Sequence, residues 1–324
     1  MFKIKHILIK MNRSFIFKIF VFWVILFILD FGIGSLLEYY YFKQKSGHLA
    51  RANYSIDQTT ADLLIFGAST ANHQYIPEIF EKRLHLTAYN VGRDGTSIIY
   101  HYALLKAILK RYTPKIIILD IRRELAAKSD GYDRLSMLFP YYKKHPEFNE
   151  MIKLKGQYEN IKMVSKIYPF NSLIFAIFAG NTGQIDSGDS DVKGYIPLTR
   201  VWNEEIDTLR TPILYNLDPN KIRMFESFIK ACIAAKIKLY IVISPNFFIM
   251  DYTDIADKKA REIAGTYNVT FLNYSQDSLF LTNAKYFADI HHLNQSGSTL
   301  LSNRLVNKIT EDEKYDYLNH NTQY

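Results

Sequence analysis

The sequence predicts an α/β fold in which a mostly parallel five-stranded sheet is covered by helices on both faces, with a transmembrane helix in front of it. Short apolar runs alternate with helical patterns after residue 60, which is typical of a parallel sheet. The run KIIILD at 115–120 is continuously apolar, as in strands that are covered on both faces. The segment 19–37 contains a single charge and is long enough to span a bilayer as a helix.

The five strands are expected at apolar runs that end in glycine, proline or polar residues. They are LLIFG (63–67), TAYNVG (87–92), KIIILD (115–120), KLYIVISP (238–245) and NVTFLN (268–273). Apolar spacing places helices between them, at 76–84, 96–110, 218–235, 253–266 and 295–309. The third of these has Asp218 as N-cap and Pro219 at its first position, both typical of a helix start.

The positive charge of the chain is concentrated at its N-terminus. The net charge is +8, and residues 1–18 supply five of these charges without an acidic residue, which leaves +3 for the remainder and no basic face for nucleic acid. A basic head before an apolar span places the N-terminus inside. We therefore expect a single-pass protein of the cytoplasmic membrane, anchored by 19–37, with its domain outside; a cleaved signal peptide is the alternative.

Asp30 is the charge inside this span. A carboxylate is costly in lipid, so Asp30 is expected near the outer interface or against a partner helix in the membrane. Tyr39 to Phe42 supply the aromatic residues that are common at that interface.

The rest of the chain divides into three regions, the second of which contains an insertion. We interpret 38–60 as a polar stalk, 61–311 as the globular domain and 312–324 as a polar, frayed tail. Residues 125–215 interrupt the alternation of strands and helices and are interpreted as an insertion, either a lid over the sheet edge or a helical elaboration of the core. The single cysteine, Cys232, excludes an intrachain disulfide.

Two short motifs carry the candidate chemistry. In LLIFGASTANH, Ser69 follows the first strand, where it is either part of a glycine turn or a presented nucleophile. In YFADIHHLNQSG, Asp289 and His292 are three residues apart, so on a helical turn they would share a face. The carboxylate would then hold Nδ1–H of the imidazole and leave Nε2 free to accept the serine proton. By the same geometry His291 points elsewhere, and Asn294 is expected to cap the last helix.

Together, the Gly-x-Ser after the first strand, the glycine turn NVGRDG and the C-terminal Asp-x-x-His resemble the SGNH/GDSL hydrolase superfamily. The resemblance covers about 60–125 and 215–311 and implies a three-layer sandwich of flavodoxin-like type. It implies a catalytic triad of Ser69, Asp289 and His292, with the backbone N–H groups of Ser69 and Gly95 in the oxyanion hole. The family supplies an asparagine after the third strand, but this chain reads ILDIRREL there; by register, Arg123 is expected to take its place.

The chain most resembles membrane-anchored SGNH proteins that act on envelope polysaccharides, which implies an acylated glycan as substrate and no cofactor. The triad would serve an esterase or an O-acyltransferase equally. The alternative is an inactive SGNH fold, kept as a scaffold or glycan-binding subunit, which the missing asparagine favours. Metal ligation by Asp289, His291 and His292 lacks a further ligand set. Aromatic residues of the insertion are expected either to stack sugars or to pack in the core: Tyr141, Tyr142, Tyr168 and Phe170.

Overall fold

The computed structural model describes residues 13–127, 130–182, 192–203, 209–210, 215–250 and 254–321. Its centre is a parallel sheet with the strand order β2-β1-β3-β5-β7. The strands are β1 (Leu63–Phe66), β2 (Ala88–Asn90), β3 (Ile116–Asp120), β5 (Lys238–Ile243) and β7 (Thr270–Asn273). This sheet confirms the predicted fold class, since all five expected strands are present and all neighbours run in parallel.

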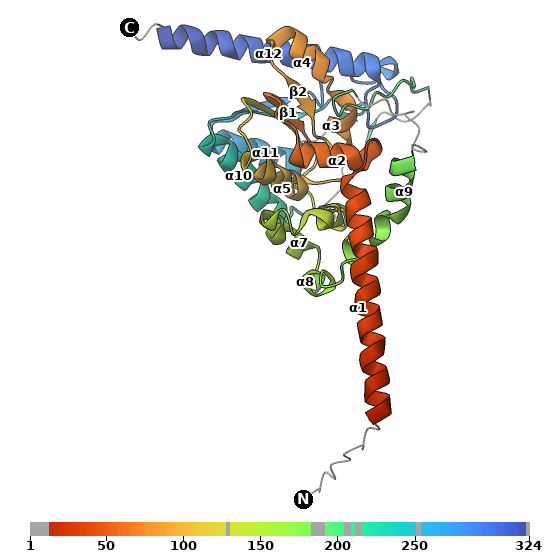
Figure 1. The fold of residues 1–324 in the computed structure, drawn as a ribbon. Coiled ribbons are helices and arrows are strands. Elements are labelled where there is room, and N and C mark those ends of the chain that lie inside the picture. Colours follow the sequence, from red (N-terminus) through yellow and green to blue (C-terminus); the bar gives the residue numbers. More distant parts are fainter. Residues whose placement is uncertain are drawn as a thin grey trace, which may run out of the picture.

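Helices cover both faces of the sheet, so the domain has three layers (Figure 1). Alternate residues of a strand point to opposite faces, and β1 divides in this way: Leu64 and Phe66 belong to one buried cluster, Leu63 and Ile65 to the other. The first cluster is covered by α5 (Ile98–Leu109), α10 (Pro219–Ala234) and α11 (Ile255–Thr266). The second is covered by α3 (Ser69–Gln74), α4 (Pro77–Leu84) and α12 (Gln295–Asn321).

The helix starts follow their capping residues. Asp218 accepts hydrogen bonds from the backbone amides of Asn220 and Lys221, as expected for the N-cap of α10. Asn294 accepts from the amides of Ser296 and Gly297 at the start of α12. The end of α12 differs from the prediction, because the helix continues to Asn321 through the expected frayed tail. No glycine or proline stops it there.

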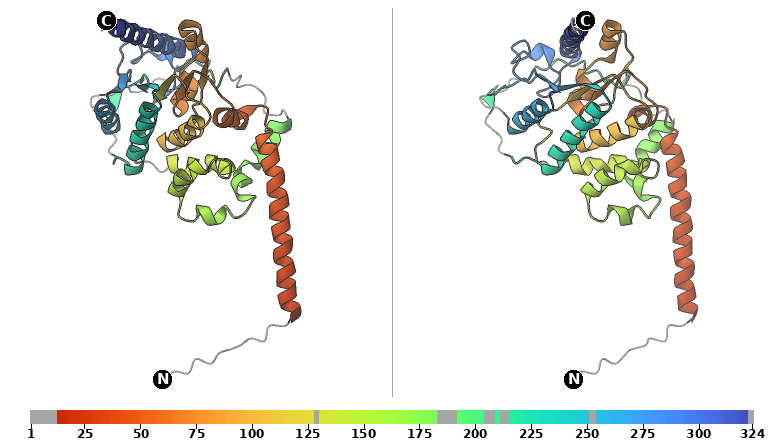
Figure 2. Two further views of the ribbon diagram at one scale, coloured as in Figure 1. Left: turned by 60° about the vertical axis from the view of Figure 1, so that its left-hand side comes forward. Right: turned by 90° about the vertical axis from the view of Figure 1, so that its left-hand side faces the viewer.

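The long N-terminal helix α1 (Arg13–Phe42) projects from the domain (Figure 2). Most of its apolar side chains are exposed. It has the length and composition of a membrane span or a signal sequence. The predicted stalk is wrong: α1 continues to Phe42, and most of the remaining segment forms α2 (Gly47–Asp57). Leu49 and Ile56 of α2 are buried in the same cluster as α5. The segment 38–60 is therefore part of the folded domain.

The insertion 125–215 is a group of short helices packed under α5. Its elements are α6 (Asp130–Asp133), η1 (Arg134–Tyr141), η2 (Pro146–Phe148), α7 (Asn149–Lys155), α8 (Glu159–Lys162), η3 (Tyr168–Leu173) and α9 (Ile174–Thr182). Its side chains Leu138, Phe148 and Met151 are fully buried in the cluster of α5. This arrangement fits the helical elaboration, and Figure 1 shows α9 beside α1.

The aromatic residues of the insertion pack in the core. Tyr141 and Phe170 are buried, and Tyr142 and Tyr168 are partly buried against the same cluster. Tyr141 and Phe170 thus follow the core-packing alternative, while stacking of sugars on the partly buried Tyr142 and Tyr168 stays a prediction. Two further short elements, β4 (Leu209–Arg210) and β6 (Ile249–Met250), pair in parallel outside the central sheet, and η4 (Ala284–Tyr286) precedes the Asp289 loop.

Asp30 of α1 binds the loop between α8 and η3. Its carboxylate accepts hydrogen bonds from Ser165 Oγ at 2.5 Å, the amide of Lys166 at 2.7 Å and the amide of Ile167 at 3.3 Å. One turn along the helix, a Cβ on Gly34 would lie 2.5 Å from the backbone of Lys166, so only glycine allows this close approach. Asp30 therefore has hydrogen-bond partners within its own chain. This differs from both environments expected from the sequence, the outer interface and a partner helix in the membrane.

We expect Asp30→Ala to loosen the loop 165–167 from α1. Hydrogen bonds to a charged group are worth about 1.5–3 kcal/mol, so the amides of Lys166 and Ile167 should exchange with deuterium at least about tenfold faster in the full chain in detergent. The control is Ser35→Ala on the same helix, where the hydroxyl donates to the carbonyl of Phe31. Equal exchange in wild type and Asp30→Ala would show that the contact contributes nothing.

Candidate functional site

Ser69 stands at the end of β1, on the first residue of α3. The turn that presents it needs Gly67, which has φ +147°, a backbone conformation that other residues rarely adopt. A Cβ on Gly67 would also lie 2.7 Å from the Cβ of Ala71 and 2.9 Å from the carbonyl oxygen of Asp120. The strand-glycine-serine sequence therefore forms a tight turn that leaves Ser69 at the carboxyl edge of the sheet.

His292 lies within hydrogen-bond distance of Ser69. The distance from His292 Nε2 to Ser69 Oγ is 2.8 Å, and His292 Nδ1 lies 2.9 and 3.0 Å from the two carboxylate oxygens of Asp289. The structure therefore brings together the three residues that the sequence singles out at positions far apart in the chain.

The route to this geometry differs from the expected one. Asp289 and His292 lie in a bend and not on a helical turn, between the paired residues Phe287 and Leu293. The bend holds because Asp289 Oδ1 accepts the backbone amides of His291 and His292 at 2.7 and 2.9 Å. The same carboxylate thus shapes the loop and orients the imidazole.

Hydrogen bonding decides the protonation of this group. Burial alone would raise the pKa of Asp289, but the hydrogen bonds from the His292 ring and from the two amides outweigh it and hold that pKa well below its usual range. An ionised Asp289 only accepts hydrogen bonds, so Nδ1 of His292 carries the proton. Nε2 is then the acceptor for the hydroxyl of Ser69, which is the arrangement that a general base requires.

A buried carboxylate anchors α3 to the sheet beneath Ser69. Asp120, at the end of β3, accepts from Thr70 Oγ1 at 2.6 Å and is also bonded to the hydroxyls of Tyr75 and Ser244. Burial raises the pKa of Asp120 although all three hydroxyl contacts act to lower it. The residue after the nucleophile is therefore fixed to the central strand, a contact that the apolar pattern of KIIILD did not reveal.

The glycine turn after β2 is tied to the same helix. Asn90 donates from Nδ2 to the carbonyl of Ala71 at 2.7 Å, and its Oδ1 accepts the amide of Gly92 at 2.9 Å. Gly95 has φ +70°, and a Cβ there would lie 3.0 Å from Arg134 Nε. The turn is held against α3, and the role of the Ser69 and Gly95 amides in an oxyanion hole stays a prediction.

The choice between the two arginines after β3 is corrected by the structure. Arg123 forms an ion pair with Asp254, with 2.7 Å between Nε and Oδ2, at the start of α11. Arg122 is the side chain that reaches the triad loop: its Nη1 donates to the carbonyl of His291 at 3.1 Å, and its Nη2 lies 2.8 Å from His291 Nδ1. The two adjacent side chains point in different directions, as alternation predicts. The expectation that Arg123 faces the site is wrong, because Arg122 is the one that reaches the triad loop.

His291 accepts the contact from Arg122 because its ring is neutral. Burial and then the charge of Arg122 lower the pKa of His291 to about 4. Gln74 Nε2 also donates to the carbonyl of His291, at 3.2 Å. Among the described residues His291 thus contacts Arg122 and Gln74, which hold its loop in place.

His73, four residues after Ser69, is buried. Its Nδ1 lies 2.9 Å from the carbonyl oxygen of Ile196, and its Nε2 lies 3.2 Å from Asp94 Oδ2. A carbonyl and a carboxylate both accept, so both ring nitrogens donate and His73 carries a positive charge. Burial lowers the pKa of His73, but its bond to Asp94 outweighs this and the net shift is upward.

The imidazolium of His73 lies next to the triad, with 5.6 Å between its ring centre and that of His292. Sequence reasoning missed the pair of His73 and Asp94 because the two residues come from different turns, after β1 and after β2. A polar residue at the end of each of two neighbouring parallel strands was the signal that could have found it.

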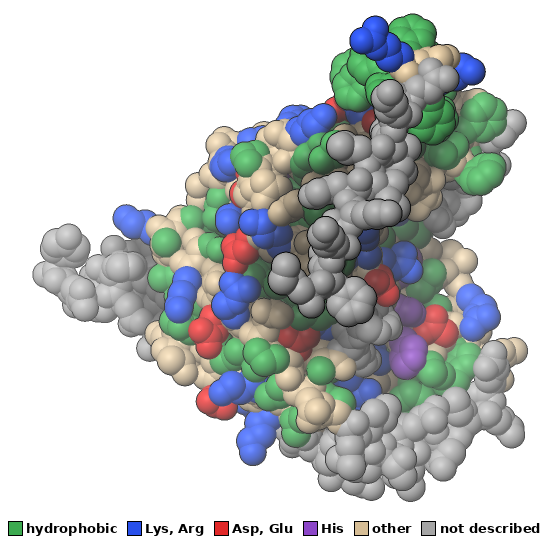
Figure 3. Space-filling view, turned by 90° about the horizontal axis from the view of Figure 1, so that it is seen from below, with side chains coloured by type: hydrophobic (Ala, Val, Ile, Leu, Met, Phe, Trp, Pro, Cys, Tyr) green, Lys and Arg blue, Asp and Glu red, His purple; other side chains and the backbone are tan. Residues whose placement is uncertain are grey.

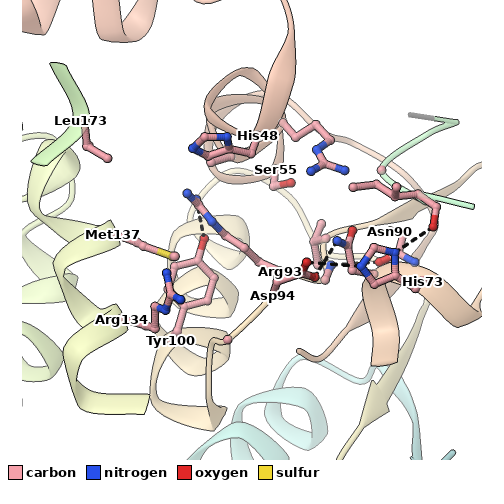
Figure 4. Close-up of a pocket in the computed structure, with 18 residues that line it drawn as sticks. His48, Ser55, His73, Asn90, Arg93, Asp94, Tyr100, Arg134, Met137 and Leu173 are labelled. Atoms are coloured by element: carbon pink, nitrogen blue, oxygen red, sulfur yellow. Dashed lines mark hydrogen bonds and ion pairs between the residues drawn. The ribbon is translucent and has the colours of Figure 1, made fainter. Parts of the chain in front are cut away.

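A cavity of about 440 Å³ opens beside His73 (Figure 4). It is bounded by α2, by the turn after β2, by η1 and by residues 194–196. Within the residues that the structure describes, no group of three or more His, Cys, Asp or Glu side chains could hold a metal ion.

Comparison with known proteins gives a distant structural likeness. No family model and no curated protein matches the sequence. Among solved structures, the chain is similar to the psychrotrophic esterase EstA from Pseudoalteromonas sp., with a TM-score of 0.41 and 10% sequence identity over 78% of this chain and 98% of that one. A likeness this weak carries no argument about function, which has to come from the site itself.

Proposed function

We propose that the chain is a serine acyl-ester hydrolase or O-acyltransferase that acts on envelope polysaccharide. The observation that carries the proposal is the geometry of Ser69, His292 and Asp289, with 2.8 Å between Oγ and Nε2 and an ionised carboxylate on Nδ1. In such an arrangement the histidine activates the serine hydroxyl for nucleophilic catalysis.

The reaction begins when Ser69 Oγ attacks the ester carbonyl while His292 Nε2 takes the hydroxyl proton. The developing oxyanion is stabilised by the amides of Ser69 and Gly95, and the imidazolium of His292 by Asp289. His292 returns the proton to the leaving alcohol, and an acyl-serine remains. Water or a sugar hydroxyl, deprotonated by His292, then attacks the acyl-serine. The bond to Ser69 Oγ breaks, His292 returns the proton to that oxygen, and a free acid or an acylated sugar is released.

The apolar helix supports placement at a membrane. We infer that α1 is an uncleaved anchor with its N-terminus inside and the domain outside. Exposed apolar side chains of the insertion lie next to it, among them Val164, Phe175 and Phe178, which are 85%, 89% and 62% exposed. Seen from below, hydrophobic side chains gather at the top of the view, over α1, and lysine and arginine side chains are spread over the rest (Figure 3).

A second candidate function is an inactive scaffold or glycan-binding subunit. The absence of an asparagine from ILDIRREL favours it, since loss of one oxyanion donor typically costs about 100- to 1,000-fold in rate. The contact of Arg122 with His291 favours it too, because it engages that arginine in holding the loop.

A fluorophosphonate probe separates the two. Only an activated serine displaces the fluoride and becomes labelled, so we expect one adduct in the full chain in detergent, on the peptide that contains Ser69. Loss of labelling after heat denaturation is the control for specificity. A protein that stays unlabelled, or is labelled equally at many serines, would favour the scaffold.

A further inference from the structure

The cavity beside His73 carries an excess of positive charge. Three guanidinium groups line it, from Arg51 on α2, Arg93 in the turn after β2 and Arg134 on η1. Figure 4 shows Arg93 and Arg134 on one side of the cavity and His73 with Asp94 on the other. The triad lies next to this second group, since His73 contacts His292.

None of the three guanidinium groups forms an ion pair with a carboxylate of the described residues. Arg93 Nη1 donates to the hydroxyl of Tyr100 at 3.5 Å, and its guanidinium lies 6.0 Å from the centre of that ring. Arg51 Nη1 is buried and has no hydrogen-bond partner in the described part of the chain. A buried donor without a partner costs free energy, so Arg51 in particular has an unmet demand for an acceptor.

The carboxylate at the cavity does not meet this demand. Asp94 accepts from Asn72 Nδ2 at 2.7 Å and from His73 Nε2 at 3.2 Å. Its charge is thus balanced by the imidazolium of His73, and the arginines remain uncompensated. His48 at the same wall adds no negative charge, and burial, together with the charges of Arg93 and Arg51, lowers its pKa to about 4.

We propose that this cavity binds an anionic group, a phosphate or a carboxylate, on the sugar next to the ester that Ser69 attacks. The planar guanidinium fork matches the oxygens of either group. A volume of about 440 Å³ is within the usual range for a small-molecule site. This inference rests on the proposed function and narrows its substrate from an acylated glycan to an acidic or phosphorylated one.

The test is a binding measurement, so that it does not depend on catalysis. The wild-type full chain in detergent is titrated with glucose 6-phosphate, glucuronate and glucose in a calorimeter at low salt. We expect at least one of the two anions to bind at least about tenfold more tightly than glucose, because each charge-assisted hydrogen bond is roughly twice as strong as a neutral one. Tighter binding of one of the two anions shows whether the cavity prefers a phosphate or a carboxylate group.

Arg51→Gln and Arg93→Lys are the informative variants. Arg51→Gln removes the charge, and Arg93→Lys keeps the charge and removes the fork; each should weaken binding of the preferred anion about tenfold or more. The control is Arg223→Gln, whose arginine pairs with Glu150 on the outer surface of α10, and which should bind as wild type does. Circular dichroism checks that each variant is folded. If Arg93→Lys is unfolded, the binding result of Arg51→Gln alone tests the inference.

Equal binding of glucose and both anions, or anion binding unchanged in Arg51→Gln, would overturn the inference. The proposed function is tested by a different experiment. If the protein binds the anion but is not labelled by the fluorophosphonate, the anion site is supported and the esterase function is rejected. If the protein is labelled at Ser69 but binds no anion, the esterase function is supported and the anion site is rejected.

Discussion

Ser69→Ala is expected to abolish hydrolysis of a small acetyl ester while the protein remains folded. The hydroxyl lies 2.8 Å from His292 Nε2, and no other hydroxyl or thiol is bonded to that nitrogen among the described residues. Loss of the nucleophile from a triad removes covalent catalysis altogether, so kcat should fall by at least about 1,000-fold. The measurement is release of 4-nitrophenol from 4-nitrophenyl acetate by the full chain in detergent, beside thermal melts of both proteins.

Ser227→Ala is the matched control for this experiment. That serine lies on α10, in the layer away from α3; its hydroxyl donates to the carbonyl of Arg223 in its own helix, and it also forms a side-chain hydrogen bond with Tyr102. It should retain the wild-type rate and the wild-type fluorophosphonate adduct. Hydrolysis at the wild-type rate by Ser69→Ala would show that Ser69, Asp289 and His292 do not act as a catalytic triad.

Asp289→Asn is expected to lower kcat by about 10⁴-fold, the scale seen when a triad histidine is held in the wrong tautomer. Asp289 Oδ1 accepts two backbone amides, so the single oxygen of an asparagine should take that position. Its NH₂ group would then face His292 Nδ1, which has to accept. The proton moves to Nε2, and the base can no longer receive the proton of Ser69.

The tautomer can be read directly, which separates this mechanism from simple unfolding. The ¹⁵N chemical shifts of His292 should show a proton on Nδ1 in the wild type and on Nε2 in Asp289→Asn. Asp312→Asn is the control, since the partner of Asp312 among the described residues is Lys308 on the same helix, α12. A variant with the wild-type tautomer and rate would mean that Asp289 shapes the loop and has no part in the chemistry.

The sheet could be predicted from sequence because its signal is local. Each strand is a short apolar run with a turn residue after it, and β1 and β3 are buried throughout, as a strand covered on both faces requires. The segment 38–60 gave no such signal. Its composition is polar, and only the tertiary contacts of residues such as Leu49 and Ile56 show that α2 is part of the core.

The candidate site divides in the same way. Ser69, Asp289 and His292 belong to short motifs with fixed spacing, so a resemblance identifies them. Arg122 could not be told from Arg123, because which of two neighbours faces a site depends on the backbone, and Arg123 has a φ of +54° that no pattern foretells. Arg51, Arg93 and Arg134 come from three separate elements, and nothing in the sequence says that they meet.

The bond between Asp30 and the loop 165–167 bears on how far the site can reach. A free linker as long as the segment 38–60 would let the domain wander by roughly 25 Å. Here the helix runs unbroken from Asp30 to Phe42, a rise of about 18 Å, and is held at the side by Asp30 and Gly34. With α1 in a bilayer as we propose, Ser69 would stay at a fixed distance from the membrane surface and in a fixed orientation to it. The acyl acceptor then has to be delivered to that height, and polymer farther out would escape modification.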